Sequence, residues 1–96
     1  MKEKRGKKGM QVHKLKIKPK YFNDVISNKK RFEVRLNDRG FEIGDLIVLE
    51  EFKNNRYTNR FINCEITYIL KNQEYLKENY VVLGFKTRLE LGAVIL

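Results

Sequence analysis

The residues best suited to chemistry lie close together in the stretch NKKRFEVRLNDR, residues 28–39. Charged and apolar residues alternate there, so we expect a strand on which Glu33 and Arg35 leave the sheet on the same side, with Lys30 and Arg39 at its two ends. A carboxylate between cations stays ionised and orients them, and such a group can bind a phosphate and a base edge together. The alternative, which periodicity alone favours, is a solvated ion pair worth about 0 to 1 kcal/mol.

The single histidine and the single cysteine fit the apolar pattern of their segments. His13 shares a face with Leu15 and Ile17, so a hydrogen-bonded histidine near the core is favoured over a ligand contact or a base. Cys64 alternates with apolar residues and is expected to be a packed small hydrophobe rather than a nucleophile. One cysteine excludes an intramolecular disulfide, and one histidine excludes a zinc site of Cys and His alone. We therefore predict no metal and no cofactor.

Motifs of the common enzyme classes are missing from the sequence. It contains no Gly-rich phosphate loop, no nucleophile elbow and no histidine whose spacing pairs it with a serine or cysteine. The aromatic pattern of an RNA-recognition sheet is also missing. The polar face of residues 30–39 remains as the candidate site.

Length and charge predict one small domain with a basic arm. The chain has 96 residues, 42% of them hydrophobic, which is enough for a single folded body over residues 11–96. Residues 1–20 hold nine Lys or Arg and one Glu, so they carry nearly all of the net charge of +9. Residues 1–10 are predicted to be a basic, disordered arm that either contacts a phosphate backbone or is only a solvated tail. The absence of a long apolar run or a signal peptide favours a cytoplasmic protein without membrane contact.

One early helix is predicted between two strands. Residues 11–18 alternate strictly and indicate a half-buried strand. Pro19 suits a first helical turn, and the apolar stripe after it predicts a helix of about three turns that ends near Asn28. In the strand that follows, we expect the alternate face to be in the core, namely Phe32, Val34 and Leu36.

The second half of the chain is predicted to form further strands joined by short connections. A loop at residues 38–44 precedes a buried strand at 46–52, and residues 53–56 predict a hairpin turn. The returning strand, about 57–70, has an apolar face of Ile62, Cys64, Ile66, Tyr68 and Leu70. Another strand begins at Tyr80, and the apolar C-terminal tail either adds an edge strand or packs against a second subunit, so both a monomer and a homodimer stay open.

These elements predict a mainly β (α+β) fold, with one early helix and five or six strands. Chains of this kind close into a small barrel, which removes exposed strand edges.

The chain resembles a known family over about residues 12–86. The motifs His-x-Leu-Lys-Ile, a Tyr-Phe helix, Phe-Glu-x-Arg-x-Asn-Asp-Arg and Gly-Asp occur in the order typical of the DUF3850 proteins of bacteria and phages, within the ASCH and PUA-like superfamily. ASCH domains carry the signature Gly-x-Lys-x-x-Glu-x-Arg, whose positions are occupied here by Asn28, Lys30, Glu33 and Arg35. Only the glycine is replaced, and Asn is the usual substitute where a left-handed backbone is needed.

The resemblance implies a PUA-like pseudo-barrel that binds RNA or a nucleotide in a cleft beside the first helix. Lys30 and Arg35 would then engage phosphate while Glu33 orients them. The polar edges of a base would be read by further residues of the same stretch, namely Asn37, Asp38 and Arg39. A base would stack on an aromatic ring such as Tyr21 or Tyr57.

The same superfamily offers a different, enzymatic interpretation. Some members are small amidohydrolases acting on N4-acetylcytidine, and Lys30 matches their catalytic lysine. Glu33, however, stands where those enzymes place a threonine, and their catalytic glutamate has no clear equivalent here. A third interpretation, a protein-interaction module or homodimer, follows from the apolar tail rather than from the resemblance.

Overall fold

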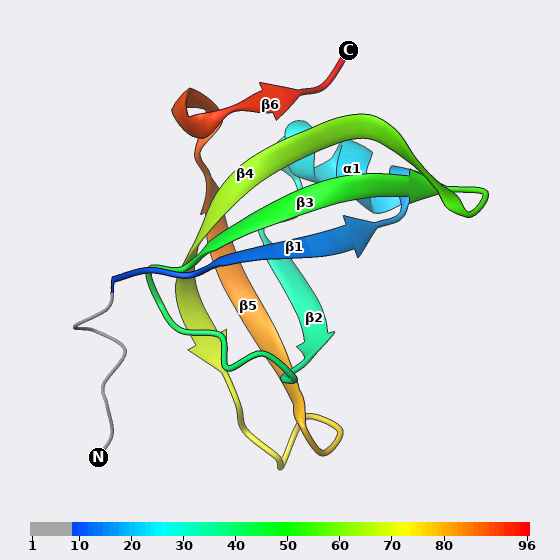
Figure 1. The fold of residues 1–96 in the computed structure, drawn as a ribbon. Helices are drawn as coiled ribbons and strands as arrows, with labels where there is room; N and C mark the ends of the chain where they lie inside the picture. The colour runs from blue at the N-terminus through cyan, green and yellow to red at the C-terminus, as the bar shows by residue number, and fades with distance from the viewer. Residues whose placement is uncertain (1–8) are drawn as a thin grey trace.

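The computed structural model describes residues 9–96, so the predicted basic arm lies outside the described residues except for its last two. One α-helix, a short 3-10 helix at Leu89–Leu91 and six strands follow one another along the chain (Figure 1). Their bounds are β1 Val12–Ile17, α1 Pro19–Ile26, β2 Phe32–Leu36, β3 Leu46–Lys53, β4 Arg56–Leu70, β5 Tyr80–Thr87 and β6 Ala93–Val94. The predicted mainly β class with one early helix is confirmed. No helix among these residues is long and apolar enough to cross a membrane.

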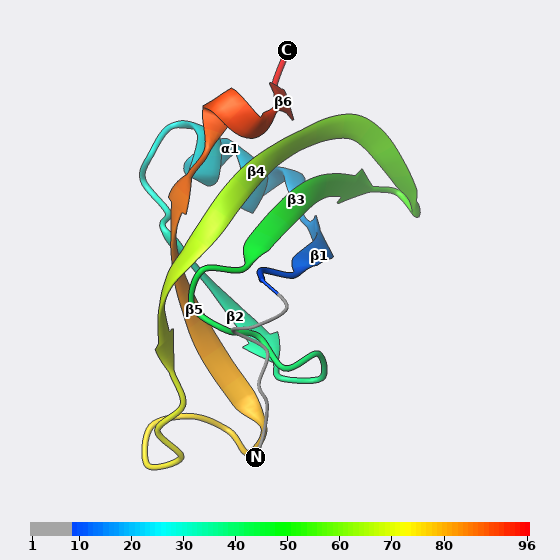
Figure 2. The same ribbon diagram turned by 60° about the vertical axis from the view of Figure 1, so that its left-hand side comes forward.

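The strands form one strongly curled sheet, a half-barrel (Figures 1 and 2). Their order is β1-β3-β4-β5-β2, with β6 added to β4; β1 runs parallel to β3, and the other neighbours are antiparallel. β1 and β2 are therefore the two ends of the sheet and do not pair by their backbones. This architecture is consistent with the predicted small β barrel, except that side chains rather than a strand ladder bridge the two ends. We call this junction between β1 and β2 the seam.

α1 is short and ends in a tight turn. Phe22 and Val25 pack into the core, as the apolar stripe predicts, but the helix has 8 residues, about two turns rather than three. Asn28 has a φ of 67°, and its N–H donates to the carbonyl of Val25 while that of Lys29 donates to the carbonyl of Asp24. These two bonds form a Schellman motif, which stops the helix. The predicted left-handed role of Asn28 is confirmed.

β2 is oriented opposite to the prediction. Glu33 is only 6% exposed, whereas Phe32 and Val34 are 47% and 51% exposed, and Leu36 is exposed too. Glu33 lies opposite the fully buried Leu83 in the β2–β5 register, so the polar face of β2 points toward the core. Alternation along a strand distinguishes two faces but does not say which is inside. The polar face can turn inward here because its charges are paired.

β4 also departs from its predicted face, in its second half. Ile62, Cys64 and Ile66 are buried as expected, but the register shifts between Ile66 and Tyr68. A shift of this kind moves the following side chains to the other face of the sheet. Tyr68 is therefore exposed, Leu70 is only half-buried, and Ile69 packs against the core instead.

The other local predictions are confirmed. Cys64 is completely buried, and burial, together with the charge of Glu33, raises the pKa of its thiol to about 12. Such a thiol is inert at neutral pH. Asn54 and Asn55, both with positive φ, form the turn of the β3–β4 hairpin. The C-terminal tail adds the edge strand β6 to β4.

Candidate functional site

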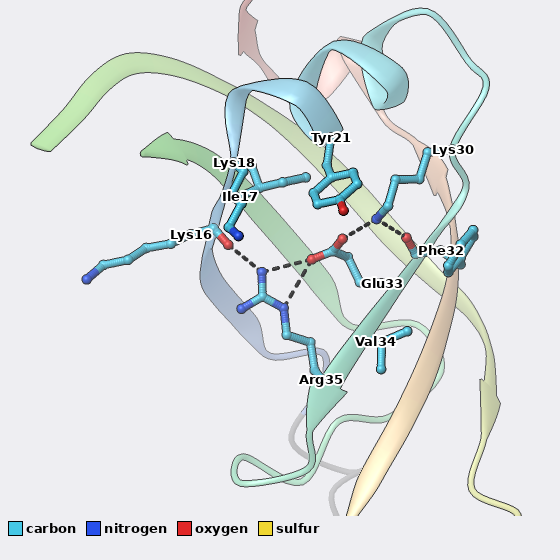
Figure 3. Close-up of a pocket in the computed structure, with 9 residues that line it drawn as sticks. All are labelled: Lys16, Ile17, Lys18, Tyr21, Lys30, Phe32, Glu33, Val34 and Arg35. Carbon is cyan, nitrogen blue, oxygen red and sulfur yellow. Dashed lines mark hydrogen bonds and ion pairs between the residues drawn. The ribbon is translucent and has the colours of Figure 1, made fainter. Parts of the chain in front are cut away.

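A cavity of about 450 Å³ opens at the seam, beside the start of α1 (Figure 3). We call it the seam cavity. Its walls come from the end of β1, from α1, from the turn after α1 and from β2. The lining residues are Lys16, Ile17, Lys18, Tyr21, Lys30, Phe32, Glu33, Val34 and Arg35.

The buried carboxylate of Glu33 organises this cavity. Lys30 Nζ forms an ion pair with Glu33 Oε1. Arg35 donates to Glu33 Oε2 through Nε at 3.1 Å and through Nη2 at 2.8 Å. Lys30 belongs to the turn that Asn28 closes, and Arg35 lies two positions after Glu33 on β2. The predicted arrangement, a carboxylate held between two cations, is thus present and largely buried.

Two arginine side chains bridge the seam, and Lys30 binds the edge of β2. Arg35 Nη2 also donates to the carbonyl of Lys16, and Arg39 Nη1 donates to the carbonyl of Lys14 at 2.7 Å. Lys30 Nζ donates to the carbonyl of Phe32 at 2.5 Å. These carbonyls belong to the two end strands of the sheet, and an unpaired strand edge is open to pairing with other chains. The cationic side chains therefore occupy edge groups that a closed barrel would have paired.

Arg35 keeps donors available for a ligand. A guanidinium has five N–H groups in a planar fork. Nε and Nη2 of Arg35 are engaged, whereas Nη1 has no hydrogen-bond partner among residues 9–96. Lys16 and Lys18 add two exposed cations to the lining, and among the described residues neither forms an ion pair. Four cationic residues thus line the cavity beside one carboxylate, although the ammonium group of Lys16 points away from Glu33 toward Phe52 (Figure 3). This balance favours an anionic ligand.

Aromatic rings lie on either side of Lys30. Its Nζ is 5.6 Å from the ring centroid of Tyr21 and 4.9 Å from that of Phe32. Both rings are substantially exposed, and together with Lys30 they also line a second hollow of about 300 Å³. A flat ligand that enters the seam cavity therefore meets an aromatic surface next to a fixed positive charge.

Three predicted residues after β2 lie outside the cavity lining. Asn37 is half-buried, its N–H donates to the carbonyl of Asn79, and its Oδ1 is a buried atom without a partner among the described residues. Asp38 and Arg39 are exposed and form a loose ion pair of 3.5 Å between Arg39 Nε and Asp38 Oδ1. Arg39 contributes to the seam, but none of the three lines the space where a ligand would enter.

His13 is a structural residue on the core side of β1. Its Nε2 lies 2.8 Å from Asp45 Oδ2, and its ring makes an edge contact with Phe41 at 4.8 Å between centroids. Asp45 also accepts the backbone N–H groups of Gln11 and Glu42, so this buried group fastens the loop after β2 to β1. The expectation of a hydrogen-bonded histidine near the core is confirmed, and His13 lies outside the cavity lining.

Sequence reasoning missed the contribution of β1 to the site. Lys16 and Lys18 alternate with apolar residues, which predicts their exposure but not their neighbours. Lys16 is 19 positions from Arg35, and no local pattern indicates that these residues meet. Tyr57, the other aromatic proposed for stacking, lies at the β3–β4 hairpin, outside the seam cavity.

A second buried ion pair lies away from this cavity. Glu51 on β3 accepts two hydrogen bonds of 2.9 Å from Arg60 on β4 and one of 2.6 Å from the hydroxyl of Thr58. Arg60 also donates to Asn23 Oδ1 and to the carbonyl of Ile95, so it joins β4 to α1 and the tail. The hydrogen bond from Arg60 is the main reason why the pKa of Glu51 falls to about 2. No local pattern of residues indicates this cluster.

Comparison with known proteins places the chain in a family. Residues 12–85 match the family model described as "Domain of unknown function (DUF3850)". The chain belongs to the DUF3850 family. The DUF3850 match contains every residue that lines the seam cavity. A relative in Escherichia phage P2, an "Uncharacterized 12.9 kDa protein in GpA 3'region", is 38% identical over 72 residues, which are 75% of this chain. The match spans 65% of the phage protein, slightly less than two thirds of its length.

Proposed function

We propose that the seam cavity binds a nucleotide unit, in single-stranded RNA or free. The observation that best supports this proposal is the hydrogen bonding of the Arg35 guanidinium. Glu33 and the Lys16 carbonyl fix its guanidinium, yet Nη1 remains without a partner among the described residues, at the wall of a cavity with three more cations. An arginine held in this way presents donors to a phosphate with little loss of side-chain entropy on binding.

Each part of the cavity has a role in this proposal. The phosphate meets Arg35 Nη1 and the exposed ammonium group of Lys18. The base stacks on Tyr21, because unpaired bases are commonly held by aromatic rings. Glu33 orients the cations. Lys30 leaves one lone pair of Glu33 Oε1 unused, and this lone pair accepts a hydrogen bond from an N–H group on the edge of the base.

A resemblance to a wider superfamily supports the same proposal. The residues at the centre of the cavity, Lys30, Glu33 and Arg35, are the ones that resemble the ASCH signature, and Asn28 has the left-handed backbone that the glycine of that signature would supply. We propose that this DUF3850 chain is an ASCH/PUA-like domain, whose relatives are thought to bind RNA in the corresponding cleft.

Binding of short fluorescent single-stranded RNAs at several salt concentrations tests this proposal. Arg35→Ala and Lys30→Ala are expected to lower the affinity at least fivefold and to make its salt dependence shallower, since each removes a positive charge from the cavity. Lys71→Ala, in an exposed loop, is the matched loss of charge and should change little. Unchanged affinity and salt dependence in both cavity variants would exclude the seam cavity as the binding site.

Hydrolysis of N4-acetylcytidine is the enzymatic alternative. Lys30 lies in the cavity, but its ammonium group is hydrogen-bonded to Glu33 and to the Phe32 carbonyl, and it must lose a proton before it can act as a base. Glu33 also stands in place of the threonine of the known hydrolases. Incubation with N4-acetylcytidine at high protein concentration, with detection of cytidine, tests this activity. Formation of cytidine that Lys30→Ala abolishes would establish the hydrolase instead of the simple binding module.

Self-association is the remaining alternative. The outer face of β2 and β4 carries exposed apolar residues, Phe32, Val34, Leu36 and Tyr68, and such a surface can pack against another chain. The tail is partly used within the chain, because β6 pairs with β4. Sedimentation of the full chain and of a version truncated after Arg88 distinguishes a monomer from a dimer held by the tail. An unchanged mass after truncation would exclude the tail as the dimer contact.

A further inference from the structure

The tip of the β3–β4 hairpin carries a second basic and aromatic surface. A hollow of about 440 Å³ there is lined by Lys53, Asn54, Arg56, Tyr57 and Thr58. Lys53 and Arg56 face each other in the register on either side of the turn, and Tyr57 is 48% exposed. The turn residues have the left-handed backbone of a tight hairpin, so the tip holds these side chains close together.

Lys16 connects this hairpin surface to the seam cavity. It lines the cavity, and its Nζ is 4.4 Å from the ring centroid of Phe52 and 5.8 Å from that of Tyr57. Phe52 and Tyr57 pack edge to face at 5.0 Å. The hairpin projects beyond the end of β1, where Lys16 lies (Figure 1). The seam cavity, Lys16, the aromatic pair and the hairpin tip therefore follow one another across the surface.

The charge of this surface suits a phosphate backbone. Lys16, Lys53 and Arg56 form no ion pair with another residue in the range 9–96. Of the carboxylates on β3, Glu51 is held by Arg60, and Glu50 lies opposite Lys16 in the β1–β3 register. Positive charge thus exceeds negative charge along the path. The half-buried ring of Phe52 and the exposed ring of Tyr57 lie among the cations, as in surfaces that hold single strands.

We propose that the hairpin tip is a second contact for the same single-stranded RNA, which runs from the seam cavity across Lys16 to Tyr57. This inference rests on the proposed function of the seam cavity. One base enters the cavity, a neighbouring base stacks on Tyr57, and Lys53 and Arg56 bind the phosphates that follow. An RNA of several nucleotides then binds more tightly than a dinucleotide, which reaches only the cavity.

Oligouridylates of two and ten nucleotides, both fluorescently labelled, test the second contact. Tyr57→Leu is expected to lower the affinity for the longer RNA about tenfold, the usual effect of removing a ring on which a base stacks, and to leave the dinucleotide unaffected. Arg35→Ala is expected to weaken both. The double variant Lys53→Gln, Arg56→Gln should lower the slope of log affinity against log salt by about 0.7 for each phosphate that is no longer neutralised, for the longer RNA alone.

Tyr75→Leu and Lys71→Gln, in the loop between β4 and β5, are the matched controls and should change nothing. If Tyr57→Leu unfolds the domain, the double variant at the exposed tip decides the question by itself. If Arg35→Ala loses affinity while the hairpin variants bind the longer RNA as well as the unaltered protein does, the second contact is overturned. The cavity then remains as the binding site. Equal losses for both RNA lengths would also overturn it, and no binding of either RNA by the unaltered protein would overturn both proposals.

Discussion

Two buried glutamates, each paired with an arginine, give this domain two similar clusters with different consequences. Glu51 and Arg60 join β3, β4, α1 and the tail, while Glu33 and Arg35 lie at the seam between β1 and β2. Four of the five N–H groups of Arg60 donate within the chain. Its guanidinium carbon also lies 4.7 Å from the centroid of the Phe22 ring. Arg35, in contrast, uses only Nε and Nη2, and neither N–H group of Nη1 has a partner within residues 9–96.

This difference in free hydrogen-bond donors distinguishes an ion pair that only stabilises the fold from one that can also bind a ligand. A cluster whose donors are nearly all used by the chain has little left to offer and stabilises the fold. A cluster that is rigid but incompletely satisfied, at the wall of a cavity, can complete its hydrogen bonds with a ligand. Buried carboxylates with arginine partners therefore do not indicate function by themselves. The number of donors that remain free is the more informative property.

Arg60→Ala is expected to give the largest effect and to act on stability alone. Removing one partner of a buried pair leaves Glu51 uncompensated, which costs about 3 to 5 kcal/mol. Urea denaturation measures this loss. Arg88→Ala, which breaks more exposed ion pairs with Glu65 and Glu90, is the control and should lose much less stability, because solvent screens exposed pairs. A loss below 1 kcal/mol in Arg60→Ala would show that the two clusters do not differ as described.

Low pH is expected to weaken the cluster of Glu51 and Arg60, because it protonates the carboxylate of Glu51. The hydrogen bond from Arg60 lowers the pKa of Glu51 from 4.5 to about 2. Because the folded pKa lies below the unfolded one, this stabilisation is complete above pH 4.5 and is lost as the pH falls toward 2. Urea denaturation between about pH 6 and about pH 1.5, a range that brackets both pKa values, measures the loss. Arg60→Ala should flatten this part of the curve, and an equal pH dependence in both proteins would contradict the assignment.

Arg35→Lys is expected to separate the two roles of the seam cluster. Lysine keeps the charge but cannot donate to Glu33 and to the Lys16 carbonyl as a planar fork does. We expect a loss of stability of about 1 to 2 kcal/mol, from the hydrogen bonds broken. The affinity for RNA should also fall, because the fixed Nη1 is gone. Full stability in urea denaturation would mean that Arg35 does not hold the seam.

Val34→Thr on the opposite face of β2 is expected to have the smallest effect. Val34 is half exposed, and threonine has a similar shape and a good strand propensity, so the change in stability should stay within about 0.5 kcal/mol. A loss above about 2 kcal/mol, accompanied by a lower mass in sedimentation, would indicate that the outer face of β2 is buried in a dimer. Thr67→Val, on β4, is the reverse change and serves as the control.

Much of the local structure was predictable because it depends on neighbouring residues. Pro19 and Asn28 mark the beginning and the end of the helical region, and the Asn54-Asn55 turn closes its hairpin. The alternating pattern around Cys64 was enough to predict its burial. The length of α1 was overestimated, because the Schellman turn begins to form before Asn28.

The candidate site was predictable only in part. Lys30, Glu33 and Arg35 do come together. Glu33 and Arg35 are two positions apart on β2, and Lys30 comes from the turn before this strand. The alternation of β2, however, was assigned the wrong way round, since apolar residues were assumed to face inward. The inward face carries Glu33 because its charge is matched by Lys30 and Arg35, and burial of a paired charge is tolerated where burial of a single one is not.

The sequence by itself determined the elements, the two faces of each strand and the group Lys30, Glu33 and Arg35. These follow from backbone geometry and the order of residues over a few positions. The tertiary structure alone decided which face of β2 points inward and that Lys16 meets Arg35. It also decided that Arg60 reaches Asn23 and the Ile95 carbonyl, 37 and 35 positions away. Contacts between such distant segments depend on how the sheet curls and which strands become its ends, and this is a property of the whole chain.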